Sequence, residues 1–290
     1  MAGPGRWLTR ILLGLVGLIA LALVVIYVMS ERYLARTYPV REVAITLPTD
    51  SASLARGERL ARLSCYGCHG ETLTGTVMFE APLVARLVTP NALIAISEYS
   101  DAQLAGLLRY GVRTDGTSPM TMPPIGMYHM SDADLASLIA YLRTVPKQPG
   151  APLPTTSYGP LGRLGMLAGQ FPTTVNLIDT TVARIGADTA VMGSRQGEYL
   201  ARMICTDCHG AGLTGGVNGP APSPSLSGAL GYSPTEFLAL LHEGKPREAG
   251  KAIPNMSEVA THTLKYLTED EVRAIHAYLA ALPASGVTMR

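Results

Sequence analysis

All four cysteines of this 290-residue chain lie in two copies of one five-residue pattern. Residues 65–69 read Cys-Tyr-Gly-Cys-His, and residues 205–209 read Cys-Thr-Asp-Cys-His. The similarity continues on both sides of this pattern, over residues 56–75 and 196–215. Repetition of a long segment marks a duplicated structural unit. We therefore expect two similar units, each with its own hydrophobic core.

In each copy, two thiols three positions apart are followed directly by an imidazole. C-x-x-C-H is the sequence signature of covalent c-type haem attachment. The two thiols add to the two vinyl groups of one haem, and the adjacent histidine becomes the proximal ligand of the iron. The sequence thus predicts two covalently bound haems c, held by Cys65, Cys68, His69, Cys205, Cys208 and His209.

Three other uses of paired cysteines explain less of the pattern. Disulfides suit an exported protein, but they give neither histidine a role. A structural zinc site needs four ligands close together, whereas Cys65 and Cys205 are separated by a whole duplicated unit. A redox-active C-x-x-C does not require a histidine at the same place in both copies. Haem attachment accounts for all of these residues.

Both units resemble the class I cytochrome c family, over about residues 53–146 and 194–283. In that family a first helix leads into C-x-x-C-H, and a last helix crosses it closely at a small residue and an aromatic residue. The resemblance implies an all-α fold of two tandem cytochrome c domains after a single N-terminal transmembrane helix. The positions that match the helix crossing are Gly57, Tyr141, Gly197 and Tyr278.

Local sequence signals agree with helices. In each unit a first helix is expected to run into the cysteine pattern, a middle helix to begin at a serine cap, and a last helix to end at a proline. No convincing alternating pattern of a strand appears. The expected helix starts are Ser53, Ser100 and Ser131 in the first unit, and Ser194, Ser233 and Thr268 in the second.

The family supplies a methionine as second axial ligand from a loop before the last helix. In the first unit the resemblance points to Met122, which precedes Pro123 as in the cytochrome subunits of membrane-bound alcohol and aldehyde dehydrogenases. Met120 is its nearest rival, and Met127, Met130 and His129 are further candidates.

In the second unit the corresponding methionine is Met256, although no proline follows it. His242 or His262 remains an alternative ligand, and either would make a bis-histidine haem of lower potential. His276, on the last helix, is expected at the surface.

The N-terminal segment is strongly apolar. Residues 11–29 carry no charge, and a helix of this length nearly spans the hydrocarbon layer of a bilayer. Arg6 and Arg10 precede them and favour a cytoplasmic N-terminus. The run is longer than that of a typical signal peptide and lacks a small-residue cleavage site, so an anchor is preferred over a cleaved leader.

The expected organisation has five parts. They are an anchor at 1–30, a stalk at 31–52, a first cytochrome c domain at 53–146, a linker at 147–193 and a second cytochrome c domain at 194–290. The start of the linker is rich in proline and is expected to be extended. The sequence Gly210 to Gly215 matches G-x-G-x-x-G but follows the cysteine pattern rather than a strand, so a turn is expected there.

These features predict an electron carrier rather than an enzyme. Its haem domains would lie in the periplasm on a single-pass anchor in the bacterial inner membrane, relaying single electrons between redox partners of a respiratory, photosynthetic or dehydrogenase complex. The alternatives are a dihaem enzyme such as a peroxidase with one open iron, the cytochrome subunit of a dehydrogenase complex, or a gas-sensing or structural subunit. With 23 basic and 22 acidic residues, the charge balance argues against nucleic acid as a partner.

Overall fold

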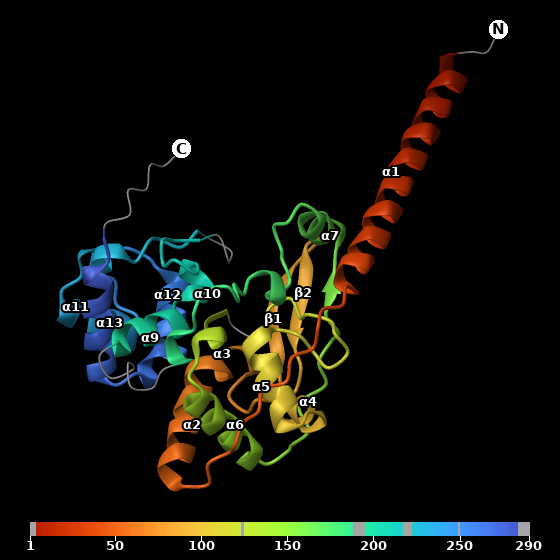
Figure 1. The fold of residues 1–290 in the computed structure, drawn as a ribbon. Helices are drawn as coiled ribbons and strands as arrows, with labels where there is room; N and C mark the ends of the chain where they lie inside the picture. The colour runs from red at the N-terminus through yellow and green to blue at the C-terminus, as the bar shows by residue number, and fades with distance from the viewer. Residues whose placement is uncertain (1–3, 123–124, 188–194, 217–221, 249, 284–290) are drawn as a thin grey trace.

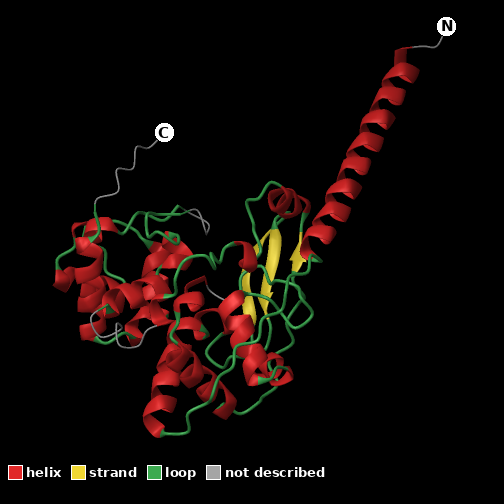
Figure 2. Ribbon diagram, viewed as in Figure 1, coloured by secondary structure: helices red, strands yellow, loops and turns green. Residues whose placement is uncertain are grey.

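The computed structural model describes residues 4–122, 125–187, 195–216, 222–248 and 250–283. A long helix, α1 (Pro4–Leu34), projects from two units that pack against each other (Figure 1). Within α1, the stretch Arg6–Leu34 is long and apolar enough to cross a membrane, and its most apolar 18-residue window has a mean hydropathy of 3.0. Figure 2 shows that helices dominate both units, which confirms the prediction of a mostly helical chain.

The middle and last helices of the first unit begin at the predicted serine caps, whereas the first helix begins at Ser51 after the cap Asp50, two residues before the expected Ser53. Ser100 and Gln103 form a reciprocal capping box at the start of the middle helix, and the Ser131 hydroxyl accepts a hydrogen bond from the Asp134 amide at the start of the last. The helical elements are α2 (Ser51–Ser64), α3 (Tyr66–His69), α4 (Ala92–Ala95), η1 (Ile96–Glu98), α5 (Asp101–Tyr110), η2 (Ile125–His129) and α6 (Asp132–Thr144).

The second unit repeats this order. Ser233 and Thr268 cap their helices through capping boxes with Glu236 and Glu271. The expected start at Ser194 lies outside the described residues. The elements are α9 (Gln196–Ile204), α10 (Thr206–His209), η5 (Ser227–Gly231), α11 (Pro234–Glu243), α12 (Pro254–His262), η6 (Leu264–Tyr266) and α13 (Glu269–Ala281).

A small antiparallel sheet corrects the expectation of a chain without strands. Strands β1 (Thr76–Ala81), β2 (Ala85–Thr89) and β3 (Ser157–Tyr158) pair in that order. The pairing register shifts between Val77 and Phe79, and most of the side chains of β1 are exposed. Because neither face of β1 is buried, the apolar and polar residues do not alternate, and the sequence carries no strand signal.

The sheet also gives structure to the connector between the units. Its third strand comes from the segment that follows the first unit, and the helical elements α7 (Pro160–Leu167), η3 (Thr174–Asn176) and η4 (Ile185–Ala187) come after it. Figure 1 shows α7 at the end of the sheet that lies beside α1. Part of the predicted linker is thus folded against the first unit.

In both units the first and last helices cross at a glycine. A Cβ atom on Gly57 would lie 2.0 Å from the carbonyl oxygen of Ser137 and 2.8 Å from the Cβ of Tyr141. A Cβ atom on Gly197 would lie 2.0 Å from the carbonyl oxygen of Ala274. No larger residue fits at these positions without moving backbone, so glycine is what permits the contact.

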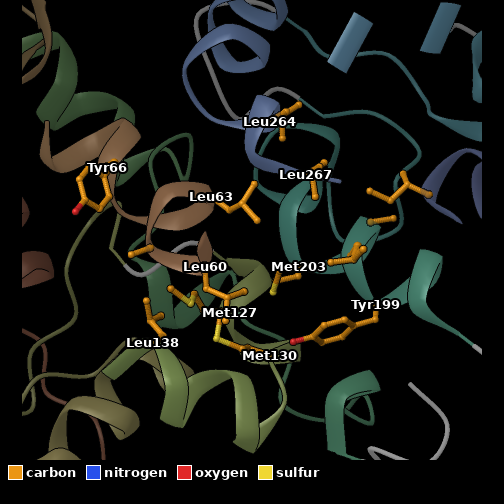
Figure 3. Packing of buried hydrophobic residues seen from close by; sticks show 14 of the residues in the cluster. Leu60, Leu63, Tyr66, Met127, Met130, Leu138, Tyr199, Met203, Leu264 and Leu267 are labelled. Carbon is orange, nitrogen blue, oxygen red and sulfur yellow. The ribbon is translucent and has the colours of Figure 1, made fainter. Parts of the chain in front are cut away.

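The two units share one hydrophobic core, so the expectation of separate cores is wrong. Figure 3 shows Leu60, Met127 and Met130 of the first unit facing Met203 and Tyr199 of the second. All five of these residues are buried. The duplication can be recognised from the sequence, but the junction joins different residues of the two copies, so the repeat does not reveal it.

Hydrogen bonds and ion pairs reinforce this junction. The buried Tyr199 hydroxyl donates to the Asp134 carboxylate at 2.7 Å and accepts from the Ser131 amide at 3.1 Å. Arg56 donates to Asp134 at 2.9 Å and to Glu271 at 3.2 Å, which links α2 to α13. Together these contacts hold the two units in one arrangement.

We expect Gly57→Ala to lower the free energy of unfolding by about 1–3 kcal/mol, because the added methyl group overpacks the contact with Ser137. Chemical denaturation followed by far-ultraviolet circular dichroism measures this. Gly212→Ala is the matched control, since its Cβ would be 3.5 Å from its nearest neighbour. Equal stability of the two variants would contradict the close crossing.

Candidate haem-attachment site

Each cysteine pattern lies where one helix passes into a single further turn. The amide of Cys65 donates to Ala61 in α2 at 2.7 Å, and the amide of His69 donates to Cys65 at 2.9 Å. The corresponding bonds of Cys205 and His209 are both 2.9 Å. Continuous helical hydrogen bonding therefore brings the two thiols and the imidazole of each pattern onto one turn, as covalent attachment of one haem requires.

The two histidines are oriented by the same hydrogen bond. Nδ1 of His69 donates to the carbonyl oxygen of Pro90 at 3.0 Å, and Nδ1 of His209 donates to that of Pro224 at 2.8 Å. A bond at Nδ1 fixes the tautomer and leaves Nε2 as the lone-pair donor to a metal. Burial lowers the pKa of both imidazoles, which favours the neutral form that a metal needs.

A tight turn follows each pattern and reverses the chain, so that Pro90 or Pro224 comes to lie beside the histidine. The amide of Leu73 donates to Gly70 at 3.0 Å and that of Gly75 to His69 at 2.9 Å. Leu73 has a φ of 59° and Leu213 a φ of 57°, so both leucines adopt the left-handed region that disfavours them. The strained turn is repeated, and the expectation that Gly210 to Gly215 forms a turn is confirmed.

Sequence reasoning matched the two leucines but missed their strained conformation and both prolines. Pro90 and Pro224 fall outside the matched segments because the repeat there is offset by a deletion of six residues, from 140 to 134. Extending the comparison of the copies across that gap would have aligned the two prolines.

The four thiols do not have the character of disulfide or redox cysteines. All are free, and burial raises the pKa of Cys65 and Cys205 to about 12. A redox-active thiol needs the opposite shift. In the part of the chain that the structure describes, no three His, Cys, Asp or Glu side chains gather as metal ligands.

The predicted axial methionines lie at different kinds of position. Met122 lies in a coil, and Met256 lies in the first turn of α12 rather than in a loop; both are partly buried against the core. Pro123 is outside the described residues. The rivals Met127 and Met130 are fully engaged in the core between the units.

The other histidines of the second unit have structural contacts. Nε2 of His242 bonds to the carbonyl of Leu267 at 3.0 Å, while His262 is exposed and bonds within its own helix. His276 is partly buried, since it bonds to the Tyr232 carbonyl at 2.7 Å and packs on the ring of Phe237. The expectation of a surface position for His276 is therefore wrong.

Asp207 joins the second haem-attachment pattern to the first unit. It lies inside the second pattern and accepts a hydrogen bond at 2.5 Å from the amide of Ile125, three residues after Met122. Burial raises its pKa to about 6, against the opposing effect of the Ile125 and Gly126 amides. Cys68 has accessible surface, yet desolvation, followed by the charges of Asp207 and Cys208, raises its pKa as well. A Cβ atom on Gly67, inside the first pattern, would lie 3.1 Å from the hydroxyl oxygen of Thr263 in the second unit.

A family model described as cytochrome c matches residues 54–146 and 194–283. The chain belongs to the cytochrome c family. Members of this family bind haem c covalently through C-x-x-C-H and transfer electrons, so both matched regions are haem-binding electron-transfer domains by family. This confirms the resemblance inferred from the sequence.

Three relatives are cytochrome subunits of dehydrogenases. The chain is 28% identical over 269 residues to the fructose dehydrogenase cytochrome subunit of Gluconobacter japonicus, covering 80% of this chain and 53% of that one. It is 27% identical over 282 residues to the alcohol dehydrogenase (quinone) cytochrome c subunit of Komagataeibacter europaeus, covering 83% and 58%. It is 24% identical over 277 residues to the gluconate 2-dehydrogenase cytochrome c subunit of Pantoea cypripedii, covering 81% and 60%. The chain therefore spans little more than half the length of these relatives.

We expect Asp207→Ala to destabilise the segment that begins at Ile125, because the amide of Ile125 loses its acceptor. An unsatisfied buried donor costs about 1–3 kcal/mol. Amide hydrogen exchange at Ile125 should accelerate, while Asp207→Asn, which keeps a side-chain oxygen, should change it less. Unchanged exchange in the alanine variant would show that Asp207 does not hold this segment.

Proposed function

We propose that the chain is a membrane-anchored dihaem cytochrome c that relays single electrons on the periplasmic side of the membrane. A haem c in each unit supplies an iron that gains or loses one electron. Cys65 and Cys68 would hold the first haem covalently, with His69 as proximal ligand. Cys205, Cys208 and His209 would hold the second. The two patterns repeat the same helix, turn and histidine hydrogen bond, and this is the observation that carries the proposal.

The proximity of the two patterns supports a relay. A Cβ atom on Gly67, inside the first pattern, would lie 3.1 Å from the hydroxyl oxygen of Thr263 in the second unit, and Asp207 bridges the second pattern to η2 of the first unit. The shared core then keeps the patterns at a fixed separation, because Tyr199 and Met203 pack against the first unit. A fixed short separation suits repeated electron exchange, since no domain motion has to precede it.

Met122 and Met256 are the proposed sixth ligands. Thioether coordination favours the reduced iron and raises the potential compared with two histidines. Both side chains are partly buried beside the core, as a ligand that closes a haem pocket would be. With Met122 and Met256 as ligands, neither iron would have a free position for a substrate, which fits a carrier and not a peroxidase.

The partner we propose is a dehydrogenase that delivers electrons from its substrate. The relatives carry this association in their names, but the substrate of such a partner does not follow from them, because this chain matches only part of their length. The acceptor would be another redox protein or a quinone-linked complex at the membrane. Helix α1 would keep the carrier at that surface, with Arg6 and Arg10 on the cytoplasmic side.

A redox titration with near-infrared magnetic circular dichroism tests the relay. We expect two one-electron transitions in the purified chain and methionine–histidine coordination for both low-spin irons. A single transition, or a high-spin component that turns over peroxide, would overturn the proposal in favour of an enzyme.

The ligand assignment has its own test. Met122→His should lower one midpoint potential by on the order of 0.1 V or more, since axial ligands set haem potentials over about 0.8 V. The other potential should move little. Met120→His is the matched control, because Met120 is two residues away, and it should leave both potentials in place. A drop with the control, or none with Met122→His, would refute Met122 as ligand.

A further inference from the structure

Helix α7 carries apolar side chains to the surface beside the foot of α1. Leu161 and Leu164 share one side of this helix and are 55% and 50% exposed, whereas Gly162 and Met166 on the other side are buried. Leu83 is 64% exposed at the turn before β2, and Phe171 is 43% exposed just after α7. We name these four exposed residues, Leu83, Leu161, Leu164 and Phe171, the α7 apolar face.

These four residues belong to one rigid piece of structure. The amide of Leu161 donates to the carbonyl of Leu83 at 3.0 Å, and a Cβ on Gly162 would lie 2.1 Å from the carbonyl oxygen of Val84. A Cβ on Gly165 would meet the ring of Phe171 at 2.5 Å. Leu83 itself has a φ of 63°, a strained conformation for a leucine that is held outward.

Arg163 fixes α7 against the end of the apolar stretch of α1. Its guanidinium lies 4.2 Å from the centre of the Tyr27 ring, donates to the Ser30 hydroxyl at 2.7 Å, and pairs with Glu31 at 2.7 Å. The apolar run ends at Met29, so these contacts are all within one turn of that point. A helix that spans the bilayer with this run places Tyr27 and Glu31 at the lipid–water boundary.

We propose that the α7 apolar face lies in the headgroup region of the lipid bilayer and fixes the orientation of the haem units against the membrane; this rests on the anchoring by α1 proposed above. The face continues the lipid-facing surface of α1, and Figure 1 places α7 beside its lower end. Residues 157–172 carry a single charge, Arg163, and Glu31 neutralises it. Interfacial segments bury such apolar faces about 5–10 Å into the headgroup region.

The consequence is a restricted orientation of the haem units. A single membrane-spanning helix can tilt and rotate in the bilayer, and the soluble units attached to it then change their angle to the membrane. A second contact between the same unit and the membrane prevents this tilting, so one side of the molecule always faces the lipid and another always faces the periplasm. The site at which a redox partner can dock is thereby limited to the surfaces that remain accessible.

Nitroxide labels on introduced cysteines test this in the full haem-loaded chain. The chain is placed in vesicles of phosphatidylcholine and phosphatidylglycerol with the haems reduced, and collisions of each label with oxygen and with a water-soluble nickel chelate are compared. Labels on Leu164→Cys and, independently, Leu83→Cys should favour oxygen several-fold more than a label on Ile94→Cys. Ile94 is the matched control, since it is 48% exposed on α4, at the far end of the same unit (Figure 1).

A label on Leu18→Cys, in the middle of the apolar run, separates the two proposals. If it reports lipid while the labels at positions 83 and 164 report water, the α7 contact is wrong and the anchor stands. If the Leu18→Cys label also reports water, both are wrong. Protection of the labels at 83 and 164 from both reagents would identify a protein contact in place of lipid, and would equally overturn the proposal.

Discussion

The hydrogen bond between each haem-pattern histidine and a proline carbonyl is the constraint on which the site depends. It selects the tautomer in which Nδ1 carries the proton and Nε2 keeps its lone pair. Burial lowers the pKa of both imidazoles and so also favours the neutral form. To make this hydrogen bond, the chain must return to the histidine within a short loop, and it does so through Leu73 and Leu213 in a disfavoured conformation. That both copies accept this strain indicates that the bond serves the cofactor rather than the fold alone.

The second organising feature is the junction between the units. The duplicated patterns could have belonged to two independently folded domains joined by a linker. Instead, Tyr199, Asp134 and the methionines between them form one buried interface. Asp207 extends this interface to the second haem-attachment pattern. A structural change in one unit should therefore alter the other. We expect that loss of the second haem would disturb the first unit rather than leave it intact.

The sequence was most informative where chemistry repeats. The C-x-x-C-H pairs, the glycines at the helix crossings and the serine and threonine caps each have a local signature, and the structure places these residues as expected. It was uninformative where structure depends on contacts between distant segments. Strands β1 and β2 are too exposed to alternate, α7 is rich in glycine and lies in the segment expected to be a linker, and the shared core joins residues from both copies. The roles of Met122 and Met256 remain predictions, because a partly buried methionine is equally suited to packing.

The central claim is that each cysteine pattern is bonded to one haem. The intact mass of the denatured chain, measured after loosely bound pigment has been removed, tests it most directly. The account predicts a mass that exceeds the polypeptide by two haems, and one haem fewer when Cys205 and Cys208 are both replaced by serine. A mass equal to the polypeptide alone, or to the polypeptide with a single haem, would contradict it.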